Sequence, residues 1–258
     1  MGLPLEMSSQ YVLFLLILNA IIMGYNDGNE VYHLEYVGFL PRADYVFKIE
    51  LINSSDISAK KVNFNVTIIK IDNTYNLCIS IVMDSLVKQV SVNVSQQNGR
   101  LFFEDAPTIF IVEPFILQKS SGSIYVTSCL DWKIFGEIIR MGKFPTAMDA
   151  YRVEALAISA YHYRGDVKAM PLNLAYDPDN GFLVHFSGVI SDPLLLKMGI
   201  KHIWGGEWRL KEYSNNIKLR LISPNYVNIN LSYLLFIFIL IFILAFITFY
   251  MILGGGIR

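Results

Sequence analysis

The sequence predicts a mainly antiparallel β protein, a sandwich or a curved meander sheet with one short helix, carried on one C-terminal transmembrane helix. Short runs of β-branched and aromatic residues recur between clusters of Asn, Ser, Asp and Gly. One of them, Lys61–Lys70, alternates apolar and polar residues, as a half-buried strand does. A further run, Leu231–Leu253, is apolar throughout and contains no charged residue.

The first half of the chain, residues 25–118, is expected to be a β-rich subdomain outside the cytoplasm. Asn98-Gly99 lies between two strand-like runs and is typical of a tight hairpin turn. The strands expected here are Val31–Phe39, Tyr45–Ile52, Val62–Ile71, Asn76–Met83, Val87–Val94 and Thr108–Val112.

A boundary is expected within Pro114–Ser123, where the composition is most linker-like, and a second β-rich subdomain over residues 119–230. Near its start, Leu130–Met141 carries apolar residues at helical spacing and predicts a short amphipathic helix that ends at Gly142. The residues with this spacing are Trp132, Phe135, Ile138 and Ile139.

A three-stranded meander is expected next. Turn sequences at Arg164-Gly165-Asp166 and at residues 177–181 separate its strands. Helix competes with strand over Ala147–Ala160, which is rich in Ala, Leu and Glu. Ile217–Ile222 alternates apolar and basic residues, as an edge strand does. The meander strands expected are Ala150–Tyr163, Val167–Tyr176 and Phe182–Ile190.

Two segments of this half, GKFPTAMDAYRV (142–153) and LAYDPDNGFLVHF (174–186), resemble a pattern of secreted or membrane-anchored archaeal surface proteins. The pattern is a Gly-x-Phe lead-in followed by a Tyr-Asp-x-x-(Thr/Asn)-Gly-apolar-Leu hairpin, and Asn180 stands where many such proteins have Thr. The resemblance covers about 45 residues and implies a curved open sheet like that of lipoprotein-carrier proteins. It implies no catalytic residue.

Membrane attachment is predicted from both ends. At about 1.5 Å rise per residue, a helix over Leu231–Leu253 is about 34 Å long, enough to cross the ~30 Å hydrocarbon core, and residues 254–258 form a short tail. Within residues 1–24, the apolar run Tyr11–Gly24 has the length of a signal-peptide core, although neither a basic n-region nor an A-x-A site flanks it. An uncleaved anchor and a buried core helix are the alternatives.

The orientation of the body follows from two opposed observations. The N-terminal apolar run directs the body across the membrane, with the C-terminus in the cytoplasm. Basic residues before the C-terminal helix outnumber those after it, which favours a cytoplasmic, tail-anchored body instead. We expect a single-pass protein of the cell membrane with an extracytoplasmic body, because the positive-inside rule weakens for long translocated domains.

An extracytoplasmic body is compatible with one disulfide and with glycosylation. Cys78 and Cys129 are the two cysteines of the chain and are expected to form a disulfide, with two buried thiols as the alternative. Asn-x-Ser/Thr acceptor sequences lie at Asn53, Asn65, Asn93 and Asn230, and glycosylation is expected at the first three because Asn230 abuts the membrane.

No catalytic, cofactor-binding or metal-binding residue is predicted. The His and Cys spacings match no zinc motif, and neither a G-x-S-x-G elbow nor a phosphate-binding loop occurs. Glu104-Asp105, Asp177 and Asp179 are carboxylates expected at a strand end and in a turn, where they have ordinary structural uses. Trp204 and Trp208 are expected in the core, with an exposed aromatic platform as the alternative.

The function expected is binding, or a structural role in the cell envelope or in a membrane complex. Its partners are the lipid bilayer and other envelope or membrane-complex subunits. A net charge of −1 argues against nucleic acid. One alternative is a carrier or sensor that holds a lipid or another apolar ligand on the curved sheet. Another is an anchored hydrolase, which requires a buried carboxylate or histidine cluster in a cleft.

Overall fold

The computed structural model describes residues 30–71, 74–97, 100–112, 114–119, 123–148, 150–223 and Ile239. The predicted signal or anchor (1–24), the tail (254–258) and the transmembrane helix over 231–253, apart from Ile239, lie outside these residues. Within the described part of the chain, no helix has the length and apolarity needed to cross a bilayer. The chain divides into two compact units at residues 223–224, and the fold described below is that of the first unit.

In its described residues, the unit is built of antiparallel strands with two short helices. In the first half of the chain the elements are β1 (Glu30–Phe39), β2 (Phe47–Leu51), β3 (Ile57–Ala59), β4 (Val62–Ile71), β5 (Thr74–Met83), β6 (Leu86–Gln97), β7 (Arg100–Phe103), β8 (Ala106–Val112) and α2 (Pro114–Lys119). In the second half they are β9 (Ser123–Cys129), β10 (Trp132–Pro145), β11 (Arg152–Arg164), β12 (Val167–Tyr176), β13 (Leu183–Ile190), α3 (Pro193–Lys197), β14 (Ile200–Tyr213) and β15 (Leu221–Ile222).

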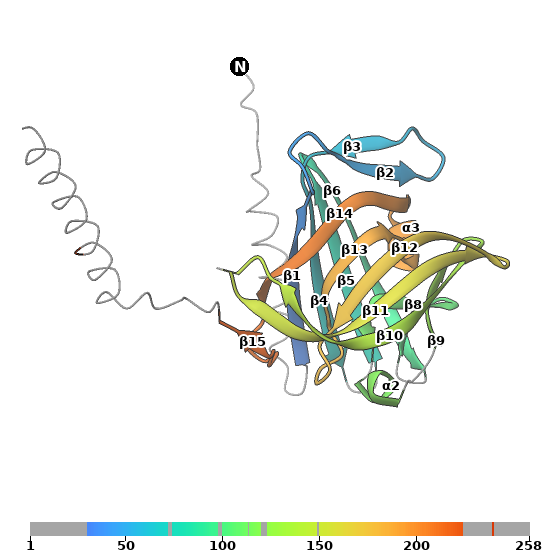
Figure 1. Cartoon of the computed structure of the whole chain (residues 1–258). Coiled ribbons are helices and arrows are strands. Elements are labelled where there is room, and N and C mark those ends of the chain that lie inside the picture. Colours follow the sequence, from blue (N-terminus) through green and yellow to red (C-terminus); the bar gives the residue numbers. More distant parts are fainter. Residues whose placement is uncertain are drawn as a thin grey trace, which may run out of the picture. The chain divides into compact units, whose positions relative to one another are not determined.

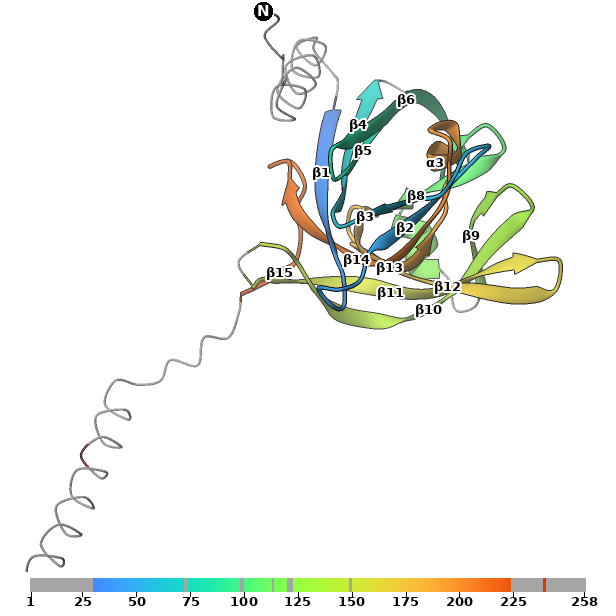
Figure 2. The ribbon, with the colours of Figure 1, turned by 90° about the horizontal axis from the view of Figure 1, so that it is seen from above.

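The strands form one curved sheet whose two halves follow the two halves of the sequence. Its order is β8-β7-β6-β5-β4-β1-β14-β13-β12-β11-β10-β9, and the β1–β14 pair joins the halves. The sheet curls until its end strands β8 and β9 contact each other (Figures 1 and 2). The expected subdomains therefore contribute to one sheet and to one continuous core.

Large aromatic side chains fill the face that the sheet encloses. Phe186 on β13 and Trp208 on β14 are directly opposite, and their rings stack at 5.1 Å. Phe64 on β4 meets both rings edge-on. The Trp208 indole N–H donates to the Val62 carbonyl at 2.9 Å, so this buried donor is satisfied. Gly206 leaves room for the Phe47 ring, since a Cβ there would lie 1.9 Å from it. Trp208 is thus a core residue, as expected.

Most of the predicted strands are confirmed. The meander forms as β11, β12 and β13, and β1, β4, β5, β6 and β8 match predicted strands to within a few residues. Gln97 pairs with Arg100, so the hairpin expected around Asn98-Gly99 exists, although these two residues lie outside the described ones. The edge strand expected over Ile217–Ile222 is shorter, since only Leu221–Ile222 pairs with β11.

The helix predicted over Leu130–Met141 is wrong, because this segment is strand β10. Its buried residues alternate, with Ile134 and Gly136 facing the core and Phe135 exposed between them. The register shifts between Ile138 and Arg140, where β10 contains one extra residue. The apolar spacing looks helical because the apolar Phe135 lies on the exposed face and because the extra residue, Ile139, breaks the period of two. Gly142 accordingly lies inside β10 and caps no helix.

Candidate functional site

A buried chain of hydrogen bonds joins His162 on β11, Ser191 before α3 and His202 on β14. His162 Nδ1 lies 3.0 Å from the Met170 carbonyl, which only accepts, so Nδ1 carries the proton. Its Nε2 then accepts from the Ser191 hydroxyl at 2.9 Å. The Ser191 oxygen accepts in turn from His202 Nδ1 at 2.6 Å. Every donor and acceptor in this series is matched when both imidazoles are neutral.

Burial keeps the imidazoles of His162 and His202 neutral. His162 and Ser191 have no exposed surface, and His202 is 2% exposed. Desolvation lowers the pKa of His162, and it lowers that of His202 to about 4, helped by the neighbouring His162 and Lys201. A serine hydroxyl that donates a hydrogen bond to a neutral imidazole is the arrangement of a nucleophile and its general base. Here, however, the hydroxyl is not accessible to solvent.

We predict that the hydrogen-bonded series His162–Ser191–His202 makes folding stability depend on pH. Because the folded pKa of His202 lies below the unfolded value of about 6.5, the unfolded chain binds the proton first as the pH falls. The stability that neutral His202 contributes is present above the unfolded pKa and is lost as the pH falls from about 6.5 toward 4. Urea unfolding should show about 1–2 kcal/mol more loss between pH 7.5 and pH 5 in the wild type than in His202→Asn, which keeps a donor near Nδ1. Equal losses would contradict the assignment.

A second buried network lies beside it and closes the curved sheet. Asp192, the N-cap of α3, accepts from Thr108 Oγ1 at 2.9 Å and from the N–H groups of Ile109 and Leu194, each at 2.8 Å. Burial raises the pKa of Asp192 to about 6 against these hydrogen bonds. The carboxylate therefore ties β8 to α3.

Arg100 on β7 completes this closure. Its guanidinium donates to the carbonyls of Tyr125 at 2.9 Å, Val126 at 2.6 Å and Thr108 at 3.2 Å. These acceptors belong to β9 and β8, the strands at the two ends of the sheet order. Arg100 is 6% exposed, and desolvation lowers its pKa. Arg100 thus links the two end strands, β8 and β9, through its side chain, where the strand order gives no backbone pairing between them.

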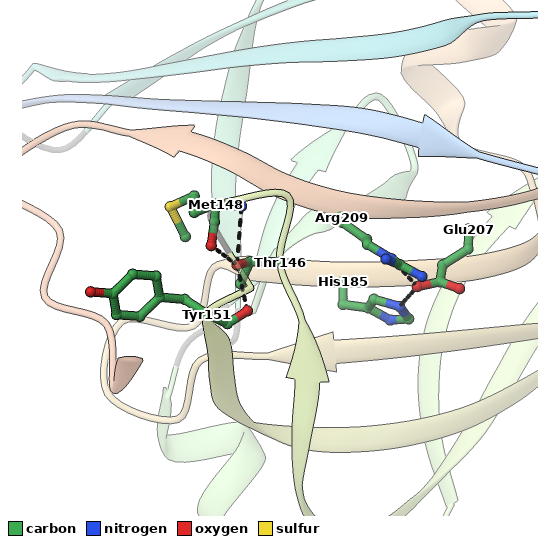
Figure 3. A network of polar contacts seen from close by, with 6 residues as sticks. All are labelled: Thr146, Met148, Tyr151, His185, Glu207 and Arg209. Atoms are coloured by element: carbon green, nitrogen blue, oxygen red, sulfur yellow. Dashed lines mark hydrogen bonds and ion pairs between the residues drawn. The ribbon is translucent and has the colours of Figure 1, made fainter. Parts of the chain in front are cut away.

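A third polar cluster lies on the outer face of β13 and β14 (Figure 3). Glu207 Oε1 accepts from His185 Nε2 at 3.0 Å and from Arg209 Nε at 2.6 Å. The His185 ring packs on Phe144 at 5.2 Å, and the Arg209 guanidinium lies 4.3 Å above the Phe39 ring. Desolvation lowers the pKa of His185 although Glu207 opposes this effect. Among the described residues, buried His185 Nδ1 has no hydrogen-bond partner and is an unused acceptor of the cluster.

The connection from β10 to β11 is fixed beside this cluster. The Thr146 hydroxyl donates to the Tyr151 carbonyl at 2.7 Å and accepts from the Met148 N–H at 3.3 Å (Figure 3). The Ala147 N–H donates to the Leu210 carbonyl of β14 at 2.8 Å. These bonds hold the connection, and Phe144 with it, against the outer face of the sheet.

The exposed counterpart of these networks is an aromatic surface, made of Tyr125, Phe135, Tyr161 and Tyr163 on the outer face of β9, β10 and β11. Phe135 is directly opposite both Tyr125 and Tyr161, so all three share one face. The Phe135 ring lies 5.5 Å from Tyr125 and 6.0 Å from Tyr163, and it is 36% exposed. From β12, the Lys168 ammonium lies 3.4 Å above the Tyr161 ring. Of the sites described, this one is open to a partner.

The disulfide predicted between Cys78 and Cys129 is not formed, and both residues are free thiols. Cys78 lies in the middle of β5, opposite Thr67 and Ser91, whereas Cys129 ends β9 in the other half of the sheet. Desolvation raises the pKa of both thiols, that of Cys129 to about 12. Both are therefore protonated and weakly reactive at neutral pH.

The predicted glycosylation sites have different surroundings. Asn53 is exposed in a turn with φ of 59°, and Asn93 is exposed on β6. Asn65 is half-buried within β4, and its amide nitrogen donates to the Ser80 hydroxyl at 3.3 Å. Asn53 and Asn93 thus have the exposure that a sugar requires, and Asn65 does not.

The carboxylates Asp177 and Asp179 and the Arg164-Gly165-Asp166 tripeptide form or stabilise turns. Asp177 is buried in the β12–β13 turn and accepts from the Asn180 N–H at 2.7 Å, while Asp179 pairs with Arg220 at 2.8 Å. Arg164-Gly165-Asp166 forms the β11–β12 turn, where Gly165 has φ of +58°. No group of His, Cys, Asp or Glu side chains in the described ranges has the arrangement of a metal site.

The buried networks were not predicted, and only partial signals pointed to them. Asp192-Pro193 before an apolar run is a helix-start pattern that marks Asp192 as a cap. The pairing of His162 with His202 through Ser191 depends on strand register, which the sequence does not specify. The aromatic surface was missed because Phe135 was assigned to a helix.

Comparisons with known proteins add little. No family model matches the chain, and no curated protein does. Among solved structures, the chain is similar to an inactive mutant of the CurJ dehydratase in complex with compound 21, at 10% identity over 78% of this chain and 82% of that one, with a TM-score of 0.15. A second, the dehydratase domain from the CurJ module of Curacin polyketide synthase, is 9% identical over 78% and 81%, with a TM-score of 0.12. Scores this low carry no argument about function.

Proposed function

We propose that this chain is a single-pass, surface-anchored binding protein whose β body contacts another envelope or membrane-complex subunit through the aromatic surface. One observation carries the proposal. Phe135 is 36% exposed and its tyrosine neighbours are half-buried on the outer face of the sheet, whereas the histidines, the serine and the carboxylate with catalytic potential are buried. Exposed aromatic patches are enriched at protein interfaces, where Tyr and Phe contribute large contact area.

The membrane anchor in this proposal rests on the sequence of Leu231–Leu253, and the extracytoplasmic side on the N-terminal apolar run. The free thiols of Cys78 and Cys129 neither support nor oppose an extracytoplasmic body, since buried thiols occur on either side of a membrane. Because packed side chains such as Phe64, Phe186 and Trp208 fill the enclosed face of the sheet, we do not extend the proposal to carrying an apolar ligand.

A second candidate function, an anchored hydrolase, is favoured by one contact. The Ser191 hydroxyl donates to His162 Nε2, whose Nδ1 is oriented by the Met170 carbonyl. This is the geometry of an activated nucleophile, with a carbonyl in place of the third carboxylate. It requires an opening that exposes Ser191. Labelling of the intact protein by a small fluorophosphonate, absent in Ser191→Ala, would favour this candidate over the first.

Site-specific photo-crosslinking in intact membranes tests the binding proposal. A benzophenone amino acid at Phe135 should give one adduct of discrete mass, and the same group at Val87 should not. Val87 is a matched control, since it is 40% exposed on β6, in the other half of the sheet. Loss of the adduct in Tyr163→Ser would assign the contact to the aromatic surface. The same adducts at both positions, or none at Phe135, would overturn the proposal.

A further inference from the structure

The described domain ends beside the β10–β11 hairpin. β15 pairs with the start of β11, with Arg152 opposite Ile222 and Val153 opposite Leu221. The Glu154 N–H donates to the Arg220 carbonyl at 3.0 Å. Both views of the ribbon show β15 at this end of the hairpin (Figures 1 and 2). The polypeptide therefore leaves the described domain at this end of the hairpin and continues from there toward the predicted transmembrane helix.

Large apolar side chains are exposed here. Ile139 is the extra residue of the β10 bulge and is 59% exposed, and Met141 two residues on is 40% exposed. Tyr151 and Leu221 are each 37% exposed. Bulges re-aim side chains, and this one directs an isoleucine into solvent that regular alternation would place elsewhere. Exposed apolar residues grouped at one end of a domain mark a contact surface.

Basic side chains stand among them. Arg140 and Lys143 on β10, Arg152 on β11 and Lys218 before β15 are all exposed. Of the described residues, three carboxylates lie in the same region: Glu137 is exposed on β10, Glu154 is opposite Lys143, and Asp179 is bound by Arg220 at 2.8 Å. The basic side chains exceed these carboxylates, so the surface carries a local positive charge on a chain whose net charge is −1. We call the exposed apolar and basic residues together the basic–apolar rim.

The chain length limits how far this rim can be from a bilayer. Residues 224–230 separate the described domain from the apolar run that starts at Leu231. Fully extended, they span at most about 25 Å. A lysine or arginine at an anionic bilayer surface gains ~1 kcal/mol, and this gain falls off within a Debye length of about 8–10 Å. The tether therefore lets the rim reach the bilayer surface, and the attraction operates once the rim is within that distance.

We propose that the basic–apolar rim docks on anionic lipid headgroups of the bilayer in which the chain is anchored. Arg140, Lys143 and Arg152 contact the phosphates, and Ile139 and Met141 insert at the level of the headgroups. The inference rests on the proposed function for the anchor alone and is independent of what binds the aromatic surface. It fixes the orientation of the body on the membrane.

Spin labelling of the full chain tests the inference. The chain, carrying Cys78→Ser to remove the more exposed thiol, is labelled at Ile139→Cys and reconstituted into vesicles of phosphatidylcholine alone or with phosphatidylglycerol. Val167→Cys is the control position, since Val167 is 67% exposed at the start of β12. Collision with a water-soluble nickel complex reports exposure of each label, and flotation of the vesicles reports anchoring.

The label at Ile139 should lose access to nickel in vesicles that contain phosphatidylglycerol, and the label at Val167 should keep it. The double variant Arg140→Gln, Lys143→Gln should lower the ratio of docked to undocked protein about 30-fold, which is ~1 kcal/mol for each charge, without changing flotation. Equal access in both kinds of vesicle, or shielding unaffected by the double variant, would overturn the inference. Shielding that persists in detergent micelles would also overturn it, in favour of a second copy of the chain. Failure to float would refute the anchor itself, and the proposed function with it.

Discussion

Arg100→Met is expected to lower the free energy of unfolding by about 3–5 kcal/mol. The substitution keeps the length and apolar stem of the side chain but removes the donors to the carbonyls of Tyr125, Val126 and Thr108. Those buried acceptors lose their partners, and Asp192 loses the nearest compensating charge. Apolar contacts and the Thr127 hydroxyl, which donates to the Pro107 carbonyl, then remain between the described residues of β8 and β9, the ends of the sheet.

Urea unfolding followed by tryptophan fluorescence measures this effect, since Trp208 is fully buried in the core. Arg140→Met is the matched control, because Arg140 is exposed on β10, and it should change the free energy of unfolding by less than about 0.5 kcal/mol. If the two substitutions cost the same, Arg100 does not close the sheet.

Asp192→Ala is expected to cost a similar amount, about 3–4 kcal/mol at pH 7. It removes the cap of α3 and leaves the N–H groups of Ile109 and Leu194 without an acceptor. Thr108 loses its acceptor as well. Asp44→Ala is a suitable control, because Asp44 is exposed and its ion pair is with Arg42, two residues away and also exposed. The measurement is the same unfolding experiment, and a cost below about 1 kcal/mol would contradict the role assigned to Asp192.

The pH dependence of Asp192 has the opposite sign to that of the histidines. Its folded pKa is raised to about 6, so the stability gained from its neutral form is fully present below the unfolded pKa and is lost as the pH rises through 6. In the wild type the two effects partly cancel between pH 4 and 6.5. The comparison with His202→Asn is needed for this reason, because a pH profile of the wild type alone mixes both.

Alternation of apolar and polar residues, together with turn sequences, was enough to predict most of the strands. Alternation identified β4, and the turn sequences at 164–166 and 177–181 delimited the meander strands, of which β13 is buried on both faces. Alternation failed at β10, where the bulge at Ile139 interrupts the period. It also failed at β14, where Gly205 and Gly206 interrupt the pattern and Gly206 is required by the Phe47 ring, a contact between distant segments.

The candidate sites were less predictable than the fold, because each depends on register between strands far apart in sequence. Thr108 and Asp192 meet only because β8 packs on α3, and the hydroxyl of Ser191 bridges two histidines only because β11 and β14 flank it. The aromatic surface could have been predicted from the sequence. Once β10 is read as a strand, Phe135 lies on the polar face opposite Tyr161, which its apolar character does not explain.

Protease treatment of intact cells, with mass spectrometry of the products, tests the central claim that a binding body is displayed outside the membrane. We expect release of a fragment that contains the described domain, residues 30–223, with added mass at Asn53 or Asn93 if either is glycosylated and with Cys78 and Cys129 unbridged. Protection in intact cells, with cleavage only after lysis, would contradict an extracytoplasmic body. The body would then be cytoplasmic and tail-anchored, as the distribution of basic residues around the C-terminal apolar run favours.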